Sequence, residues 1–309
     1  MKTKCKSERA DVYERVTNQI IEAIERGAAE WRMPWHKLAG ANSMPVNAVT
    51  RKPYRGVNVL SLWATAIERG YRSSVWATYA QWRQLGAQVR KGEESSFIVF
   101  WKFDRFTEVE DASAESDGEG TERRGSILAR GYHVFNAEQV DGFALPPLEL
   151  PQPGERIEAA EQFFSHLGAE IRHGGNRAFY NPTLDFIQLP PFALFRDEAA
   201  YYATLAHECI HWSGASHRLN RDLKGRFGEE AYAAEELVAE LGAAFLCADL
   251  GIANEPRPDH AAYVQSWLSV LRNDKRAIFT AASKAQAAAD WMHDRQPDVS
   301  PVPVAAMTA

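Results

Sequence analysis

The residues best suited to chemistry in this chain are two histidines, His207 and His211, in the run His-Glu-Cys-Ile-His. Residues 197–212 predict a helix, because an Asp that can cap the first turn precedes Ala-rich and apolar residues, and Gly214 can end it. Side chains four positions apart lie on one face of a helix, so both imidazoles can bind one metal ion. Glu208 lies beside them, where its carboxylate can accept a proton from an activated water. The run therefore predicts a metal-dependent hydrolytic centre.

A catalytic zinc site takes three protein ligands and keeps a fourth position open. Residues 231–246 predict a helix that offers Glu235, Glu236 and Glu240. Glu236 and Glu240 share a face with small residues beside the apolar stripe, which favours Glu236 as the third ligand and Glu240 as a carboxylate that orients a ligand histidine. Glu235 is the alternative ligand, and a solvated acidic face is the alternative for each glutamate. Such a site accepts Zn²⁺, and also Mn²⁺ or another divalent ion.

Amide hydrolysis at such a centre needs a proton carrier and a donor to the developing oxyanion. Glu208 can take the proton of the attacking water and deliver it to the departing amine. Tyr263 is the candidate oxyanion donor, with His260 and Tyr232 as alternatives, and packing is the competing role for each. His217 and the adjacent arginine favour a surface or substrate contact over metal ligation.

The elements that must position this centre belong to a chain of two oppositely charged parts. Residues 1–106 contain 18 Lys and Arg against 10 Asp and Glu, a net charge of +8, whereas residues 107–309 contain 17 and 31, a net charge of −14. A length of 309 residues favours two domains. The three widely spaced cysteines favour a reducing compartment over a disulfide framework. Without a signal-peptide pattern or a membrane-length apolar stretch, we expect a cytoplasmic protein with no membrane partner.

Hydrophobic periodicity predicts the elements of both parts. In the first part, helices are expected over 10–26, after the turn at 54–56 and over 76–85, and a strand hairpin over 97–101 and 127–135. In the second part, a helix is expected over 157–167, three short strands over 169–172, 177–180 and 186–189, and, after the histidine helix, further helices over 229–250, 261–272 and 277–293.

These elements predict an α+β fold in two domains. An N-terminal α+β domain is expected over residues 1–145, with a disordered acidic loop at 108–124. A Pro-rich linker is expected over 146–155. The C-terminal domain, over 156–296, combines a small antiparallel sheet with the histidine helix, and a flexible tail follows over 297–309.

The first third of the chain interleaves aromatic and cationic residues. It contains six of the nine tryptophans, in runs such as WRMPWHK and QWRQ. Aromatic rings can stack on exposed bases while cations contact phosphates, so this composition suits single-stranded DNA, although a core position is the competing role for each tryptophan. The expected phosphate contacts are Arg51, Lys52, Arg55, Arg90 and Lys91, and the expected stacking residues are Trp35, Tyr54 and Trp76.

Both parts also resemble a known family. HECIHWSGASHRLNRDL, EELVAELGAAFLCADLGI and YVQSWLSVLRNDKRAIFTAASKAQAAADW resemble the zincin-like domain of ArdC-type antirestriction proteins of conjugative plasmids, and are similar in plan to SprT-like and other gluzincin proteases. WRMPW, NAVTRKPYRGVNVLSL and YHVFNAEQV resemble the N-terminal domain of the same family. The resemblance implies His207, His211 and Glu236 as ligands, Glu208 as catalytic base, and non-specific binding of single-stranded DNA. The run NPTLDFIQLP resembles a family strand that borders the active-site cleft, where it can hold an extended peptide.

The resemblance and the residues together predict an antirestriction protein that binds entering single-stranded DNA and carries a peptidase-like metal domain. A restriction protein or another DNA-bound protein is the expected substrate. Two alternatives stay open. One is a DNA-binding protector whose metal site is only structural, and the other is a DNA-dependent protease that removes proteins from DNA.

Overall fold

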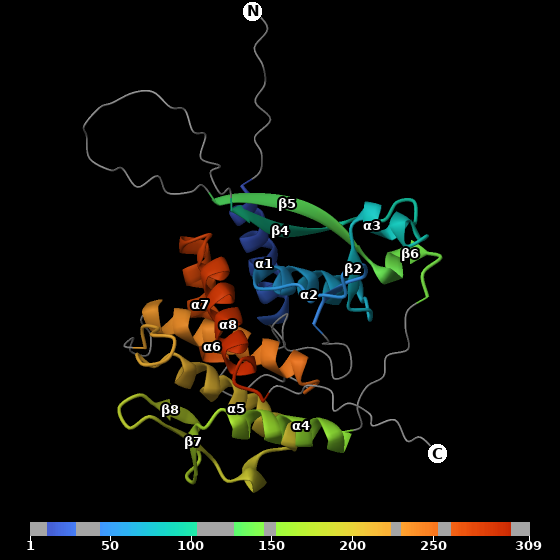
Figure 1. Ribbon diagram of the computed structural model, residues 1–309. Coiled ribbons are helices and arrows are strands. Elements are labelled where there is room, and N and C mark those ends of the chain that lie inside the picture. The colour runs from blue at the N-terminus through green and yellow to red at the C-terminus, as the bar shows by residue number, and fades with distance from the viewer. Residues whose placement is uncertain are drawn as a thin grey trace, which may run out of the picture.

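The structure is a computed structural model that describes residues 11–28, 44–103, 127–144, 153–223, 230–252 and 261–297. It confirms an α+β fold of two domains, with the N-terminal domain in the upper part of Figure 1 and the C-terminal domain reaching from beside it to the bottom. Among the described residues, no helix is both long and apolar enough to cross a membrane. Five expectations lie outside the described residues in whole or in large part: the acidic loop at 108–124, the linker, the tail, the stacking role of Trp35 and the alternative donor His260.

The N-terminal domain is built on a four-stranded mixed sheet with the strand order β1-β2-β5-β4. β4 (Ser96–Phe103) and β5 (Ile127–Asn136) pair antiparallel from end to end, which confirms the expected hairpin. α2 (Val57–Arg69) packs against β4, and α1 (Val12–Ala28) contacts β5. The remaining strands of this domain are β1 (Val46–Asn47), β2 (Val75–Ala77), β3 (Gln88–Val89) and β6 (Val140–Asp141).

The helix expected over 76–85 is wrong in its first residues, because Trp76 belongs to β2. The helix α3 (Tyr79–Gln84) begins only after Thr78, whose side chain accepts a hydrogen bond from the backbone of Gln81 at 3.3 Å in a capping box. Trp76 is 1% exposed and packs in a small core. The other buried members of this core are Leu62, Ile98 and Val134. Trp76 is therefore a core residue, and the expectation that it stacks on bases is wrong.

In the part of the C-terminal domain that the structure describes, five α-helices lie beside a three-stranded sheet. The helices are α4 (Pro153–His166), α5 (Glu198–Ser213), α6 (Glu230–Asp249), α7 (Ala261–Asn273) and α8 (Ala277–His293). The strands are β7 (Glu170–His173), β8 (Phe179–Asn181) and β9 (Phe186–Leu189). Pro153 is the first residue of α4, a position where proline needs no N–H partner, so the expected linker ends before residue 153.

The small sheet of this domain is mixed, which corrects the expectation of an antiparallel sheet. Its strand order is β7-β9-β8, with β8 antiparallel to β9 and β7 parallel to β9. The chain reverses direction between β7 and β8 and again between β8 and β9, so β7 and β9 point the same way. Because β9 lies in the middle, its pairing with β7 has to be parallel, and β8 is an edge strand of the described sheet.

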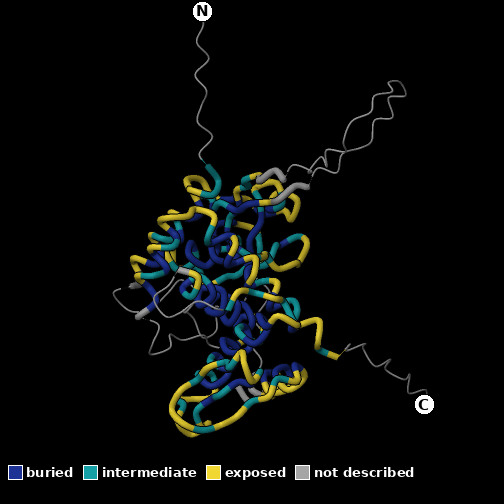
Figure 2. Tube along the Cα trace, turned by 90° about the vertical axis from the view of Figure 1, so that its left-hand side faces the viewer, coloured by how far each residue is buried: buried dark blue, intermediate teal, exposed yellow. Residues whose placement is uncertain are grey.

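The two domains share one continuous hydrophobic core. α1 packs against α7 and α2 against α8, and the same buried cluster contains Ile20 and Trp63 of the first domain and Phe245 and Trp267 of the second. Figure 2 shows buried segments running through the middle of the body. Polar contacts cross the same boundary: Thr17 Oγ1 donates to the carbonyl of Lys275 at 2.7 Å, Gly56 N donates to Gln286 Oε1 at 3.1 Å, and Arg55 pairs with Asp290. The domains therefore form a single packed unit.

Candidate metal centre

α5 carries the histidines into the interior of the C-terminal domain. Asp197 caps the helix by accepting a hydrogen bond from the backbone of Ala200 at 2.8 Å, which fixes where the first turn begins. From that start, the helix runs against α6 with His207 2% exposed and Glu208 3% exposed. Buried polar side chains need partners, and α6 supplies glutamates along the facing side. The cap therefore sets the depth at which the histidines meet α6.

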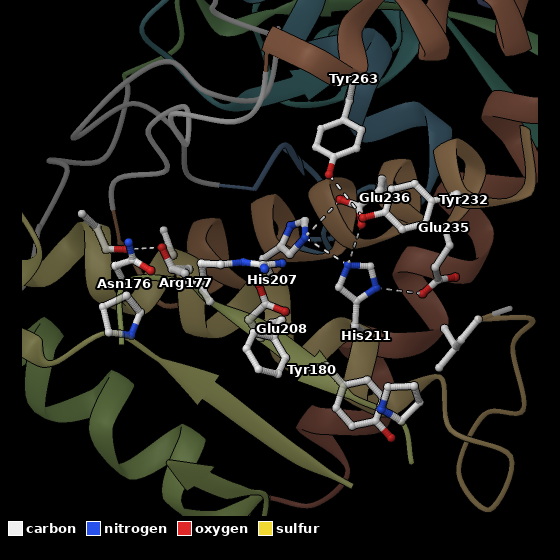
Figure 3. A pocket seen from close by; sticks show the side chains of 18 of the residues that line it. Asn176, Arg177, Tyr180, His207, Glu208, His211, Tyr232, Glu235, Glu236 and Tyr263 are labelled. Atoms are coloured by element: carbon white, nitrogen blue, oxygen red, sulfur yellow. Dashed lines mark hydrogen bonds and ion pairs between the residues drawn. The ribbon is translucent and has the colours of Figure 1, made fainter. Parts of the chain in front are cut away.

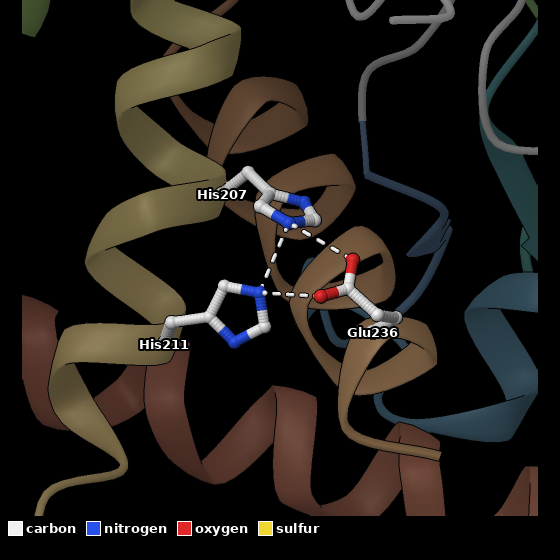
Figure 4. Close-up of side chains that lie close together, drawn as sticks. All are labelled: His207, His211 and Glu236. Atoms are coloured by element: carbon white, nitrogen blue, oxygen red, sulfur yellow. Dashed lines mark hydrogen bonds and ion pairs between the residues drawn. The ribbon is translucent and has the colours of Figure 1, made fainter. Parts of the chain in front are cut away.

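The histidines and Glu236 turn their ligand atoms toward one another (Figure 4). The Nε2 atoms of His207 and His211 are 3.1 Å apart. Glu236 Oε2 lies 3.6 Å from His207 Nε2, and Glu236 Oε1 lies 3.4 Å from His211 Nε2. Among the described residues, this is the group of His, Cys, Asp and Glu side chains whose geometry could hold a metal ion. Two imidazole nitrogens and one carboxylate fit the donor set of a divalent transition metal with an open position.

Each histidine also contacts a carboxylate on the side away from this point. His207 Nδ1 lies 3.4 Å from Glu240 Oε1, where a carboxylate that orients the ring was expected. His211 Nδ1 lies 3.3 Å from Glu235 Oε1. Glu235 thus occupies an orienting position on His211, on the opposite side of the ring from the ligand atom Nε2.

The buried charges of this cluster shift one another's protonation. Burial would raise the pKa of Glu236, but hydrogen bonds from His207 and His211 outweigh burial and hold it well below its usual range. Burial would lower the pKa of His211, but Glu235 and Glu236 outweigh it and raise the pKa to about 10. Glu235 and Glu236 therefore favour a positive charge at the histidines, which a proton or a bound cation can supply.

A cleft of about 910 Å³ opens onto the centre (Figure 3). Glu208 lines it together with the two histidines and Glu236. Tyr232 and Tyr263 also line it, with their hydroxyl oxygens 3.2 Å apart. Burial, the hydrogen bond to Tyr263 and the nearby charge of Glu236 raise the pKa of Tyr232, so its phenol stays protonated and able to donate.

Comparisons with known proteins match the chain in both domains. The model of the N-terminal domain of anti-restriction factor ArdC matches residues 10–135, and the model of zincin-like metallopeptidases matches residues 158–284. The uncharacterized protein y4eC of Sinorhizobium fredii is 55% identical over 288 residues, which cover 93% of each chain. This chain belongs to the ArdC-type antirestriction protein family.

Solved structures of the ArdC-type family share the whole arrangement. The metal-free crystal structure of antirestriction protein ArdC from the R388 plasmid is 41% identical, covers 93% of this chain and 98% of its own, and has a TM-score of 0.74. The Mn(II)-bound structure is 42% identical, covers 94% and 99%, and has a TM-score of 0.73. DNA primase TraC of Escherichia coli is 39% identical over 290 residues, which are 91% of this chain but 27% of TraC.

The residues expected to bind DNA differ in their exposure and in whether their charges are paired. Arg51, Lys52 and Lys91 are exposed and have no ion pair with any described residue. Arg90 instead pairs with a neighbouring glutamate at 2.7 Å, and Arg55 pairs with α8. The Tyr54 ring is half-buried, its hydroxyl accepts a hydrogen bond from an asparagine amide at 3.1 Å, and burial raises its pKa. Arg51, Lys52 and Lys91 therefore have the most accessible charges.

Reasoning from the sequence missed two groups at the metal centre. The sequence pattern offers Glu235 only as an alternative ligand, although adjacent residues on a helix project about 100° apart, so Glu235 and Glu236 do not both face the same ion. Arg221, which contacts Glu235, lies in a segment without periodicity and gives no sequence signal. Among the described residues, the edge strand at the cleft is β8, which shares only Asn181 with the run 181–190, whereas the strand β9 within that run is paired on both sides.

Proposed function

We propose that this ArdC-type protein binds single-stranded DNA through its N-terminal domain and hydrolyses peptide bonds in the cleft of its C-terminal domain. The observation that carries the proposal is the convergence of His207, His211 and Glu236 beside the buried carboxylate of Glu208. Zn²⁺ fits these donors, and the Mn(II)-bound ArdC relative supports Mn²⁺ as an alternative ion in the same site. A divalent ion held there supplies a Lewis acid that activates water and polarises a carbonyl.

The chain's own residues would divide the remaining work of hydrolysis. Glu208 accepts the proton of the attacking water and passes it to the departing amine. Glu240 and Glu235 hold the histidine rings. Tyr263, with Tyr232 beside it, donates a hydrogen bond to the oxygen that gains negative charge.

A protein substrate fits the walls of the cleft. β8 is an edge strand of the described sheet and contributes Phe179 and Tyr180 to the lining, so an extended peptide can add to the sheet there. Two of the lining side chains are large, apolar and exposed: Phe179 is 36% exposed and Leu194 66%. Exposed apolar groups beside a cleft are typical of a surface that binds another protein.

Single-stranded DNA would bind the exposed cations that have no ion pair with a described residue. Arg51 and Lys52 directly follow the turn at 48–50 after β1, and Lys91 lies in the turn after β3. The relationship to DNA primase TraC supports a nucleic-acid partner. Antirestriction activity follows if the protein binds the entering strand and cleaves restriction proteins close to it.

Peptide hydrolysis is tested on the full chain with a DNA-bound protein as substrate, with and without a single-stranded oligonucleotide. The wild type should cut the substrate, and a chelator should stop cleavage. Glu208→Gln should abolish cleavage while Mn²⁺ binding and DNA binding are kept. Cleavage that persists in Glu208→Gln would refute the assigned base. If no substrate is cut and antirestriction in cells survives Glu208→Gln, the metal site is structural. Cleavage that requires DNA would instead identify a DNA-dependent protease.

DNA binding is tested by anisotropy of a labelled oligo-dT over a range of salt concentrations. The double variant Arg51→Ala/Lys52→Ala should weaken binding and reduce the salt slope by about 1.4, since each lost phosphate contact removes about 0.7. Lys91→Ala should weaken binding more than its matched control, Arg90→Ala, whose charge is already paired. Equal affinities for all variants would place the DNA elsewhere.

A further inference from the structure

Arg221 is a buried arginine next to the metal centre. It lies in the segment that follows α5, and its side chain is only 4% exposed. A guanidinium is strongly hydrated in the unfolded chain, so its burial is costly unless charged and hydrogen-bonding partners replace the water. The partners it has therefore indicate what the side chain is for.

The guanidinium joins Glu235 to the end of the histidine helix. Its Nε lies 3.1 Å from Glu235 Oε2, and its Nη2 lies 2.9 Å from Glu235 Oε1. Its Nη1 donates to Ser213 Oγ at 3.0 Å, and Nη2 also donates to the carbonyl of Ile210. Two-point contact with a carboxylate fixes the direction of that group as well as its distance. Arg221 thus holds Glu235 against the last turn of α5.

Glu235 in turn holds His211. Its Oε1 lies 3.3 Å from His211 Nδ1, while His211 Nε2 points to Glu236 and the other histidine. An N–H at Nδ1 that donates to a carboxylate leaves the lone pair at Nε2, which is the form that binds a metal. Rotation of the Glu235 carboxylate would release the His211 ring.

The local backbone leaves room for this arginine. A Cβ at Gly214 would lie 2.8 Å from Nη2 and 3.0 Å from Cζ of Arg221. The backbone N–H of Arg221 also donates to the carbonyl of Gly214 at 2.8 Å. The glycine after α5 therefore lets the chain fold back and place the guanidinium under the helix end.

We propose that Arg221 is a positioning residue of the metal centre. Through Glu235 it fixes the tautomer and orientation of His211, so that Nε2 faces the ion. The inference rests on the metal site proposed above and adds a residue that acts on the affinity of that site without touching the ion.

The test is a titration of Mn²⁺ into the full-length metal-free protein, because Mn²⁺ binds more weakly than Zn²⁺ and its dissociation constant can be measured directly. Arg221→Met and Glu235→Gln should each raise the dissociation constant about 10- to 100-fold. The double variant should bind no more weakly than the weaker single variant, because both changes break one chain of contacts. Arg221→Lys keeps the charge without the two-point contact and should fall between wild type and Arg221→Met.

Arg218→Met is the matched control. Arg218 is also buried, with a side chain 8% exposed, and it also contacts the end of α5, at the carbonyl of Trp212. Its carboxylate partner is Asp185, between β8 and β9, and among the described residues neither side chain has a hydrogen bond or ion pair with His211 or Glu235. This variant should lower the melting temperature and leave the Mn²⁺ dissociation constant within about twofold, a change of less than 0.5 kcal/mol.

The outcomes separate the two proposals. If wild type binds Mn²⁺ and both Arg221→Met and Arg221→Lys bind equally well, the positioning role is refuted. The positioning role is also refuted if Arg218→Met weakens Mn²⁺ binding as much as Arg221→Met does. It is refuted as well if the increases in the dissociation constant caused by Arg221→Met and Glu235→Gln multiply in the double variant. Should Arg221→Met fail to fold, Arg221→Lys and Glu235→Gln decide the question. Wild type that binds no metal would refute the metal site itself.

Discussion

Replacing Trp63 by alanine should destabilise both domains together. Trp63 lies on α2, is 5% exposed, and packs against Phe245 of α6 with ring centroids 6.0 Å apart. Its Nε1 makes no hydrogen bond within the described residues, so the loss is one of packing alone. Removing a buried tryptophan costs about 3–5 kcal/mol. The total free energy of unfolding of a domain is roughly 5–15 kcal/mol, so the effect is a large share of it.

Urea unfolding followed by circular dichroism measures this loss. With a slope of about 3 kcal/mol per molar urea, the midpoint should fall by roughly 1–1.7 M in a single transition. Hydrogen exchange should rise in α1 and α8 alike, because the core is shared. Phe100→Ala is the control, since Phe100 is 60% exposed and its loss should stay within about 0.5 kcal/mol. Two separate transitions, with α8 exchange unchanged by Trp63→Ala, would refute the reasoning.

Three further predictions concern single contacts and are read from unfolding midpoints. Arg55→Ala should lower the free energy of unfolding by less than about 1 kcal/mol, because the side chains of Arg55 and its partner Asp290 are both more than a third exposed. A larger loss would mean that this ion pair, and not the shared core, joins the domains. Gly131→Ala should cost about 1–3 kcal/mol, because a Cβ there would lie 2.3 Å from the ring of Phe97; an unchanged midpoint would contradict this packing. Asp185→Asn should destabilise at neutral pH, because the hydrogen bond from Arg218 lowers the pKa of Asp185 below 3.8, so the carboxylate stabilises the fold above that pH. The midpoints of wild type and variant should converge as the pH falls below 3.8 toward the folded pKa, and parallel curves would show that this titration contributes nothing.

Much of the fold follows from local signals in the sequence. The cap at Asp197 and the apolar run after it predicted α5 to within one residue at each end. The boundary between β2 and α3 was missed because Trp76 continues the apolar pattern of the helix, although Thr78 and Gln81 form a capping signal that marks the true start. Local signals of this kind fix where an element begins more reliably than apolar content does.

Contacts between distant segments could not be predicted in the same way. Hydrophobic periodicity predicted a helix over 10–26, but nothing in that period says that the partner of α1 is α7. The parallel pairing of β7 with β9 depends on strand order, which the three strand segments do not encode. The spacing of the histidines indicated the metal chemistry, whereas Arg221 joined the centre only through the fold.

Diffraction at the zinc absorption edge, from crystals of the full chain grown with Zn²⁺, tests the metal centre most directly. We predict an anomalous peak about 2.0–2.2 Å from His207 Nε2, His211 Nε2 and an oxygen of Glu236. Glu235 should remain on His211 Nδ1, outside the coordination sphere. An anomalous peak next to other residues would contradict the assignment. The absence of any peak between His207, His211 and Glu236 in crystals grown with excess Zn²⁺ would contradict it as well.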